Sequence, residues 1–173
     1  LPAVCPGPHR CGQSPPAAFA LNLGGWFAEH FQAMKRYRYF WQVGVMTATD
    51  PTGTVRVKRR GTKIDLRFSS RDVSRLREGI KQLARIQLAG GASRVIPSFY
   101  HPVQIRGEDD LAQIDTLIKA PPDLMLGSAH PQGGNAMSED PGRGVVDNGF
   151  RVHGYEGLYV ADASVFPTNI WVN

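Results

Sequence analysis

The fold class of this chain is decided by residues 54–68, which read Thr-Val-Arg-Val-Lys-Arg-Arg-Gly-Thr-Lys-Ile-Asp-Leu-Arg-Phe. Apolar and polar residues alternate over 54–58 and again over 64–68, which is the pattern of half-buried strands. The intervening Arg-Arg-Gly-Thr at 59–62 reads as a turn. The stretch therefore predicts an antiparallel hairpin with one wet, basic face. Upstream, residues 41–47 predict a further strand.

A helix is predicted directly after this hairpin. Ser70 can cap it, Asp72 lies in its first turn, and the glycine pair at 90–91 stops it. One face carries a stripe at helical spacing, of which only the last member is polar: Val73, Leu76, Ile80, Leu83 and Gln87. The basic residues off this stripe are expected to face water: Arg71, Arg75, Lys81 and Arg85.

A second, acidic helix is predicted over residues 107–119, ended by Ala-Pro-Pro at 120–122. A sheet with helices packed on one face is an α+β arrangement, and we predict that class for this part of the chain. The sequence changes character after Pro122, so we place a domain boundary there, with residues 1–122 and 123–173 on its two sides.

The part after Pro122 consists of short apolar segments separated by turn residues. Residues 144–147 and 150–154 look like short paired strands. The run Leu-Tyr-Val at 158–160 is wholly apolar, so a buried strand is expected there.

Charge is unevenly distributed along the chain, whose formal net charge is +5. Residues 35–94 hold fifteen of the twenty Lys and Arg but only four of the fifteen Asp and Glu. Such a stretch can mark a surface for nucleic acid or another anionic partner. In the basic hairpin and helix over 55–85, aromatic residues do not interleave with the basic ones as binding of single strands requires, so a solvated helix and sheet face is the simpler interpretation.

Several classes of protein are disfavoured by the sequence. It contains no run of about 18 apolar residues, so no membrane span is expected. Cys5, Cys11 and His9 do not form a complete zinc-ligand set at a known spacing, so no metal site is expected. The chain does not begin with Met and stops in the apolar run at 170–173, so we expect it to be a piece of a longer protein. Residues 1–8 lack the features of a signal peptide, and we expect a cytoplasmic location.

Two features of the C-terminal part have the residue types that catalysis needs. His130 lies in a loop followed by Gly133 and Gly134, and histidine is the side chain suited to proton transfer near neutral pH. A lone histidine is more often structural, however. Asp162 ends the apolar run, and ligands in open α/β sheets bind beyond such strand ends, although Asp there is also a common turn former.

Four ordered blocks favour the catalytic interpretation. They are Ser-Ala-His-Pro-Gln-Gly-Gly at 128–134, Gly-Val-Val-Asp at 144–147, Arg-Val-His-Gly at 151–154, and Leu-Tyr-Val-Ala-Asp-Ala-Ser-Val-Phe-Pro-Thr-Asn-Ile at 158–170. Together they closely resemble the C-terminal signature of the glucose-methanol-choline (GMC) oxidoreductases. That signature is a Ser-x-His-Pro-x-Gly block, Gly-Val-Val-Asp, Asp-(Ala/Gly)-Ser-x-Phe-Pro, and an Asn or His that opens the final helix. Residues 1–120 match only in having the strands and helix expected of the family's substrate-binding domain.

The resemblance implies an FAD-dependent enzyme that oxidises the CH–OH group of an alcohol by hydride transfer to flavin. His130 matches the family's catalytic histidine, the general base that takes the hydroxyl proton. Asn173 matches the second catalytic position, where an amide can orient the alcohol and stabilise developing charge. Ala161, Asp162 and Ala163 match the segment that approaches the FAD pyrophosphate and ribityl chain.

The same resemblance assigns the two parts of the chain. Residues 1–122 would be part of the α+β substrate-binding domain, and 123–173 the C-terminal piece of an FAD-binding α/β domain. The implied partners are an alcohol and the remainder of that FAD domain. The alternative is a basic module that binds nucleic acid or an anionic partner without catalysis.

Three departures from the family pattern bear on the site. Trp171 stands where the family usually has Gly, two residues before the second catalytic position. Asn-Ala-Met at 135–137 replaces the Cys-Arg-Met of many relatives. No Gly-x-Gly-x-x-Gly follows a strand, so the dinucleotide fingerprint, which the family carries near its N-terminus, is absent here.

Overall fold

The structure is a computed structural model that describes residues 15–100, 103–120, 123–128 and 130–170. The described residues form two compact units. The first comprises residues up to 47 together with 73–126, and the second comprises 48–72 together with 127 onwards. The domain boundary expected at residue 122 stays a prediction, and each unit is described below by itself.

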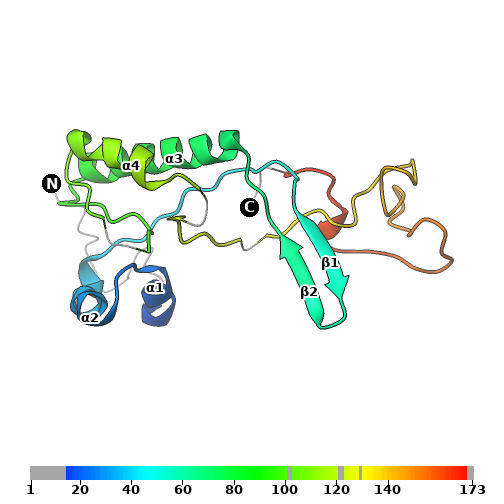
Figure 1. Cartoon of the computed structure of the whole chain (residues 1–173), viewed down its shortest axis with the longest axis horizontal. Coiled ribbons are helices and arrows are strands. Elements are labelled where there is room, and N and C mark those ends of the chain that lie inside the picture. Colours follow the sequence, from blue (N-terminus) through cyan, green and yellow to red (C-terminus); the bar gives the residue numbers. More distant parts are fainter. Residues whose placement is uncertain (1–14, 101–102, 121–122, 129, 171–173) are drawn as a thin grey trace. The chain divides into compact units, whose positions relative to one another are not determined.

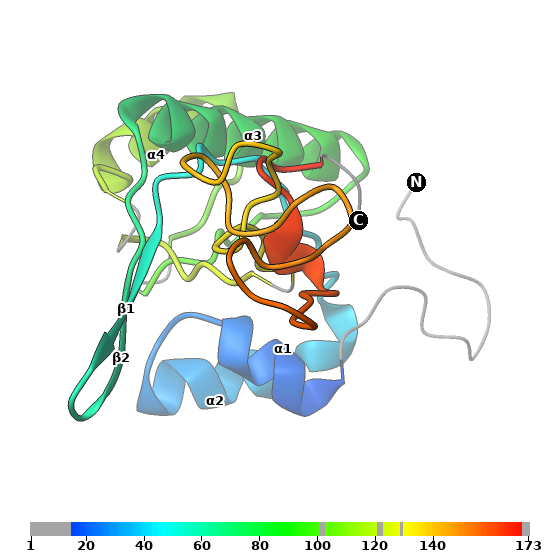
Figure 2. The same ribbon diagram turned by 90° about the vertical axis from the view of Figure 1, so that its right-hand side faces the viewer.

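The first unit is helical. It contains α1 (Pro16–Asn22), α2 (Phe27–Lys35), the short 3-10 helices η1 (Tyr37–Tyr39) and η2 (Glu108–Leu111), α4 (Ala112–Leu117) and most of α3 (Ser70–Ala89). Helix α4 runs alongside α3, and α1 lies next to α2 (Figures 1 and 2). The predicted acidic helix is confirmed as η2 followed by α4.

The core of this unit lies between α3 and the segments around α4. It includes apolar residues of α3, of η2 and α4, and of two extended segments: Val73, Leu76, Ala84, Phe99, Ile105, Leu111, Ile114, Ile118 and Leu124. The extended segments are held by single bridges, from Val95 to Ile105 and from Phe99 to Leu124. The predicted stripe on α3 is confirmed at its first positions, where Val73 and Leu76 are buried and Ile80 packs against the core.

The N-terminus of α3 is capped by Ser69 rather than by Ser70, which is already helical. The Ser69 hydroxyl accepts a hydrogen bond from the Asp72 backbone N–H at 3.1 Å. The Asp72 carboxylate in turn accepts from the Ser69 backbone N–H at 2.9 Å. This reciprocal pair of hydrogen bonds is a capping box, in which the capping residue lies three positions before the acidic residue. With Asp72 as the acidic residue the cap is Ser69, so the prediction of Ser70 was wrong by one residue.

Two basic side chains of α3 that were expected to face water are partly exposed and also form ion pairs. Lys81 Nζ lies 2.5 Å from Asp115 Oδ2, and Arg85 Nη2 lies 2.5 Å from Glu108 Oε1. Arg77 Nε adds a hydrogen bond of 2.6 Å to the Ile118 carbonyl. Basic α3 and its acidic neighbours are therefore complementary, which also leaves less free positive charge for an anionic partner.

The strand predicted over residues 41–47 is not formed, because this extended segment lacks a strand partner in the described part of the chain. It packs on α3 instead. A Cβ added at Gly79 would lie 2.5 Å from Val45 Cγ1, so only glycine at this point of the helix permits the approach.

The second unit contains the predicted antiparallel hairpin, β1 (Thr54–Lys58) and β2 (Gly61–Asp65). Its register pairs Val55 with Ile64 and Lys58 with Gly61, so the loop between the strands holds only two residues. Strand β2 therefore begins and ends about three residues earlier than the predicted strand over 64–68. The strands are not half-buried: both faces are exposed, and the Val57 side chain is 89% accessible.

The remainder of the second unit, residues 127–170, is organised by bridges rather than by long strands. Val146 is buried and pairs with Val152, which confirms the predicted contact between 144–147 and 150–154. The run at 158–160 is not buried as expected. Leu158 is 47% and Tyr159 59% exposed, and Tyr159 bridges only to Arg151.

Helices combined with a two-stranded antiparallel sheet are compatible with the predicted α+β class. The assignment of residues 123–173 to a piece of an FAD-binding domain stays a prediction. No helix in the described ranges is long and apolar enough to cross a membrane.

Candidate active-site loop

The candidate site is built on the loop that carries His130, which is held along the 3-10 helix η4 (Ala163–Val165). Three backbone N–H groups of the loop donate to three successive carbonyls of η4. The pairs are Gly133 to Ala163 at 3.4 Å, Asn135 to Ser164 at 3.0 Å and Met137 to Val165 at 2.9 Å. Segments that are far apart in sequence, and that were both predicted to belong to the site, are thus fastened together.

Two glycines give the loop its course. Gly133 has a φ of +76° and Gly134 a φ of +99°, which is the left-handed region that side-chain-bearing residues rarely adopt. Gly133 itself donates to η4, and the left-handed conformation of both glycines lets the backbone continue along that helix to Asn135.

A side-chain hydrogen bond reinforces this contact. The Asn135 amide Nδ2 donates to Ser164 Oγ at 2.9 Å, and the pair is partly buried. The Asp162 carboxylate accepts a hydrogen bond from the Ser164 backbone N–H at 2.8 Å, and so caps η4. A second bond, from the Ser164 hydroxyl, is the largest cause that holds the pKa of Asp162 below its usual range.

A chain of hydrogen bonds therefore joins three side chains: the amide of Asn135 donates to the hydroxyl of Ser164, which donates to the carboxylate of Asp162. Sequence reasoning had treated Asn135 only as a departure from the family pattern and had assigned no role to Ser164. The sequence carries no signal for them, because the partial burial that makes these two polar side chains need partners is known only from the structure.

The predicted site residues have different positions in the structure. His130 is exposed in its loop, and Ala161 and Asp162 are also exposed, whereas Ala163 is half-buried in η4. Asn173 and Trp171 lie outside the described residues. The structure thus joins the histidine loop to the 161–163 segment, while the roles assigned to these residues stay predictions.

The Gly-Val-Val-Asp block builds a turn that supports the loop. Asp147 Oδ1 accepts from the backbone N–H groups of Gly149 at 2.8 Å and Arg151 at 3.0 Å, and Oδ2 accepts from Arg151 Nε at 3.0 Å. These bonds, above all the one from the Arg151 backbone, lower the pKa of Asp147. His153 Nε2 lies 2.9 Å from the Ser138 carbonyl oxygen, so this histidine has a structural contact.

The described residues contain no cluster of three or more His, Cys, Asp or Glu side chains that could hold a metal ion. Cys5, His9 and Cys11 lie outside the described ranges.

Comparison with known proteins identifies relatives of the chain. The family model described as GMC oxidoreductase matches residues 42–173. An uncharacterised GMC-type oxidoreductase of Mycobacterium tuberculosis is 30% identical over 161 residues, which are 92% of this chain and 25% of the relative. A cholesterol oxidase of Acinetobacter baumannii is 48% identical over 46 residues, covering 27% of this chain and 8% of that protein.

A dehydrogenase of Strobilurus tenacellus is 46% identical over 43 residues, covering 25% of this chain and 7% of that protein. No solved structure matches the chain significantly. The chain spans about a quarter of the length of the first of these curated relatives.

Proposed function

Since the chain belongs to the GMC oxidoreductase family, we propose that it forms the C-terminal part of an FAD-dependent enzyme that oxidises the CH–OH group of an alcohol. The observation that carries this proposal is the attachment of the His130 loop to η4, because it brings together two segments that both belong to the family signature. The fragment alone is expected to be inactive, since the dinucleotide fingerprint is not in it.

His130 is the proposed general base. Its side chain is exposed, so an alcohol hydroxyl can approach it, and its loop is anchored a few residues later by Gly133 and Asn135. A base must lie within about 2.6–3.2 Å of the proton-bearing oxygen, directly or through one water, so a fixed loop favours proton transfer. Bound FAD would supply the hydride acceptor.

Asn173 is proposed to hold the same substrate oxygen. An amide both donates and accepts, so it can orient the alcohol and stabilise the negative charge that develops as the proton leaves.

The 161–163 segment fits one part of the cofactor better than another. Asp162 is exposed, and its pKa is lowered by the hydrogen bonds from Ser164, which favours the carboxylate form. A carboxylate would repel the pyrophosphate of FAD but accept hydrogen bonds from hydroxyl groups. Alanine on both sides leaves the backbone open to close approach. We therefore assign this segment to the ribityl chain.

The partner proposed for the second unit is the remainder of the FAD-binding domain. Several large apolar side chains of this unit are exposed, among them Val57, Leu158 and Tyr159. Each buried side chain of this size contributes about 1.5–3 kcal/mol of hydrophobic free energy, so a covering domain would stabilise the unit.

The experiment is steady-state kinetics on the full-length protein with a panel of primary and secondary alcohols. The protein is expected to purify with FAD and to turn over at least one of them. His130→Ala should lower kcat about 10²- to 10⁴-fold, the usual contribution of a general base, with FAD retained. Arg143→Ala, an exposed change in the same unit, is the control and should leave kcat unchanged. A full-length protein without flavin would overturn the proposal.

A further inference from the structure

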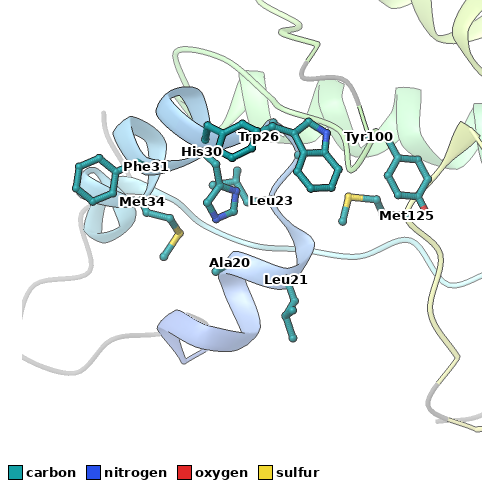
Figure 3. Close-up of a pocket in the computed structure, with 12 residues that line it drawn as sticks. Ala20, Leu21, Leu23, Trp26, His30, Phe31, Met34, Tyr100 and Met125 are labelled. Carbon is teal, nitrogen blue, oxygen red and sulfur yellow. The ribbon is translucent and has the colours of Figure 1, made fainter.

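A cavity of about 480 Å³ opens beside α1 and α2 in the first unit (Figure 3). Its wall is formed by α1, the following loop and α2, and by Tyr100 and Met125 from much later in the chain. Figure 3 shows His30 and Met34 on α2, with Trp26 between them and the Tyr100–Met125 pair. The volume lies in the range of pockets that hold small molecules.

The lining is apolar and carries no Asp, Glu, Lys or Arg. Its hydrogen-bonding side chains are His30, the indole of Trp26 and the hydroxyl of Tyr100. Met34 and Met125 contribute flexible thioethers, which adapt to ligands of irregular shape. A charged ligand would find no counter-ion on this wall, whereas one hydroxyl or carbonyl could be paired.

The walls of the cavity are mainly hydrocarbon. At its margin Trp26 is 68% and Phe27 91% exposed. Phe27 also has a φ of +47°, a left-handed conformation that is strained for a non-glycine residue and is often found at ligand sites. Burial of these apolar walls against a ligand would favour an apolar occupant.

We propose that this cavity binds an uncharged small molecule with an aliphatic or alicyclic body and a single oxygen function. The inference goes beyond the proposed function, because it concerns binding in a cavity lined only by residues of the first unit and assigns no reaction to the ligand.

The test is calorimetric titration of the full chain with methyl ketones from octanone to dodecanone, which carry one carbonyl and cannot be oxidised as alcohols. Affinity should rise about three- to fourfold for each added methylene, with a negative heat-capacity change. Met34→Glu places a charge in the cavity and should weaken binding roughly tenfold or more. Met46→Glu changes an exposed methionine of the same unit that does not line the cavity, and should not alter binding.

Two further variants separate the possible outcomes. Ala20→Phe fills the cavity without a charge and should also abolish binding, which covers a failure of Met34→Glu to fold. His130→Ala should retain binding of the methyl ketone whether or not the enzyme proposal is correct. Loss of binding in His130→Ala would mean that the ligand binds at the other unit, and would overturn the inference. Binding that ignores chain length, or that occurs only to phosphatidylcholine vesicles, would overturn it as well.

Discussion

The side-chain amide of Asn135 donates a 2.9 Å hydrogen bond to the hydroxyl of Ser164, joining two residues that are 29 positions apart. Around this bond, backbone N–H groups from the histidine loop donate to carbonyls of η4. The bond therefore connects the proposed base to the segment proposed to meet the cofactor.

Replacing Asn135 by Ala should loosen that connection. Loss of a partly buried hydrogen bond costs about 1 kcal/mol, so the free energy of unfolding of the chain, measured with urea, should fall by that amount. In the full-length enzyme kcat should fall more than KM rises, because the base is misplaced rather than substrate binding lost. Asn148→Ala, an exposed control, should change neither quantity. Equal behaviour of the two variants would show that the bond has no positioning role.

The turn at Asp147 predicts a specific dependence of stability on pH. Its pKa is lowered in the folded state, so the stabilisation is present above the ordinary pKa of Asp, about 3.9, and is lost as pH falls through the folded value. The urea midpoint of the wild type should therefore drop in acid, and Asp147→Asn should reduce that drop while lowering the midpoint at pH 7.

Asp109→Asn is the control, since it replaces an exposed carboxylate outside the Asp147 turn. An acid-induced drop of unchanged size in Asp147→Asn would contradict the assignment.

The core around α4 predicts a large cost for truncation. Ile114 is fully buried in the cluster between α3 and α4. Ile114→Ala should lower the free energy of unfolding by about 2–5 kcal/mol through lost burial and the cavity left behind. Ile86→Ala, on the exposed face of α3, should cost less than about 0.5 kcal/mol beyond its propensity effect. Denaturant unfolding measures both, and similar costs would mean that this cluster is not the core.

Gly79 makes a contact that can be tested by a double-mutant cycle. Alanine there should gain up to about 1 kcal/mol of helix propensity but lose about 1–3 kcal/mol by overpacking against Val45, so the single variant should be less stable. In a Val45→Ala background the clash disappears, and Gly79→Ala should become stabilising. A stabilising effect in the wild-type background would rule out the close approach.

The elements that the sequence predicted best are those whose interactions are local. Helix α3 follows from its apolar spacing and its polar cap, and the hairpin follows from alternation around a turn. The failures at residues 41–47 and 158–160 have one cause: apolar composition shows that a segment needs burial, but not which surface provides it. The Asn135–Ser164 bond could not be predicted, because no periodicity relates residues in two separate loops.

The candidate site was predictable to a similar extent. The ordered blocks around His130 and Asp162 led to the family, and the family is confirmed. The way the chain holds these blocks together, through two left-handed glycines and hydrogen bonds to η4, emerges only from the folded backbone.

The most direct test of the central claim is anaerobic mixing of an accepted alcohol with the full-length, FAD-loaded protein, followed by the visible absorbance of the flavin. The account predicts that the flavin is reduced by the alcohol alone, and that His130→Ala slows this step about 10²- to 10⁴-fold with the FAD content unchanged. Reduction at the wild-type rate in His130→Ala, or a flavin that no alcohol reduces, would contradict it.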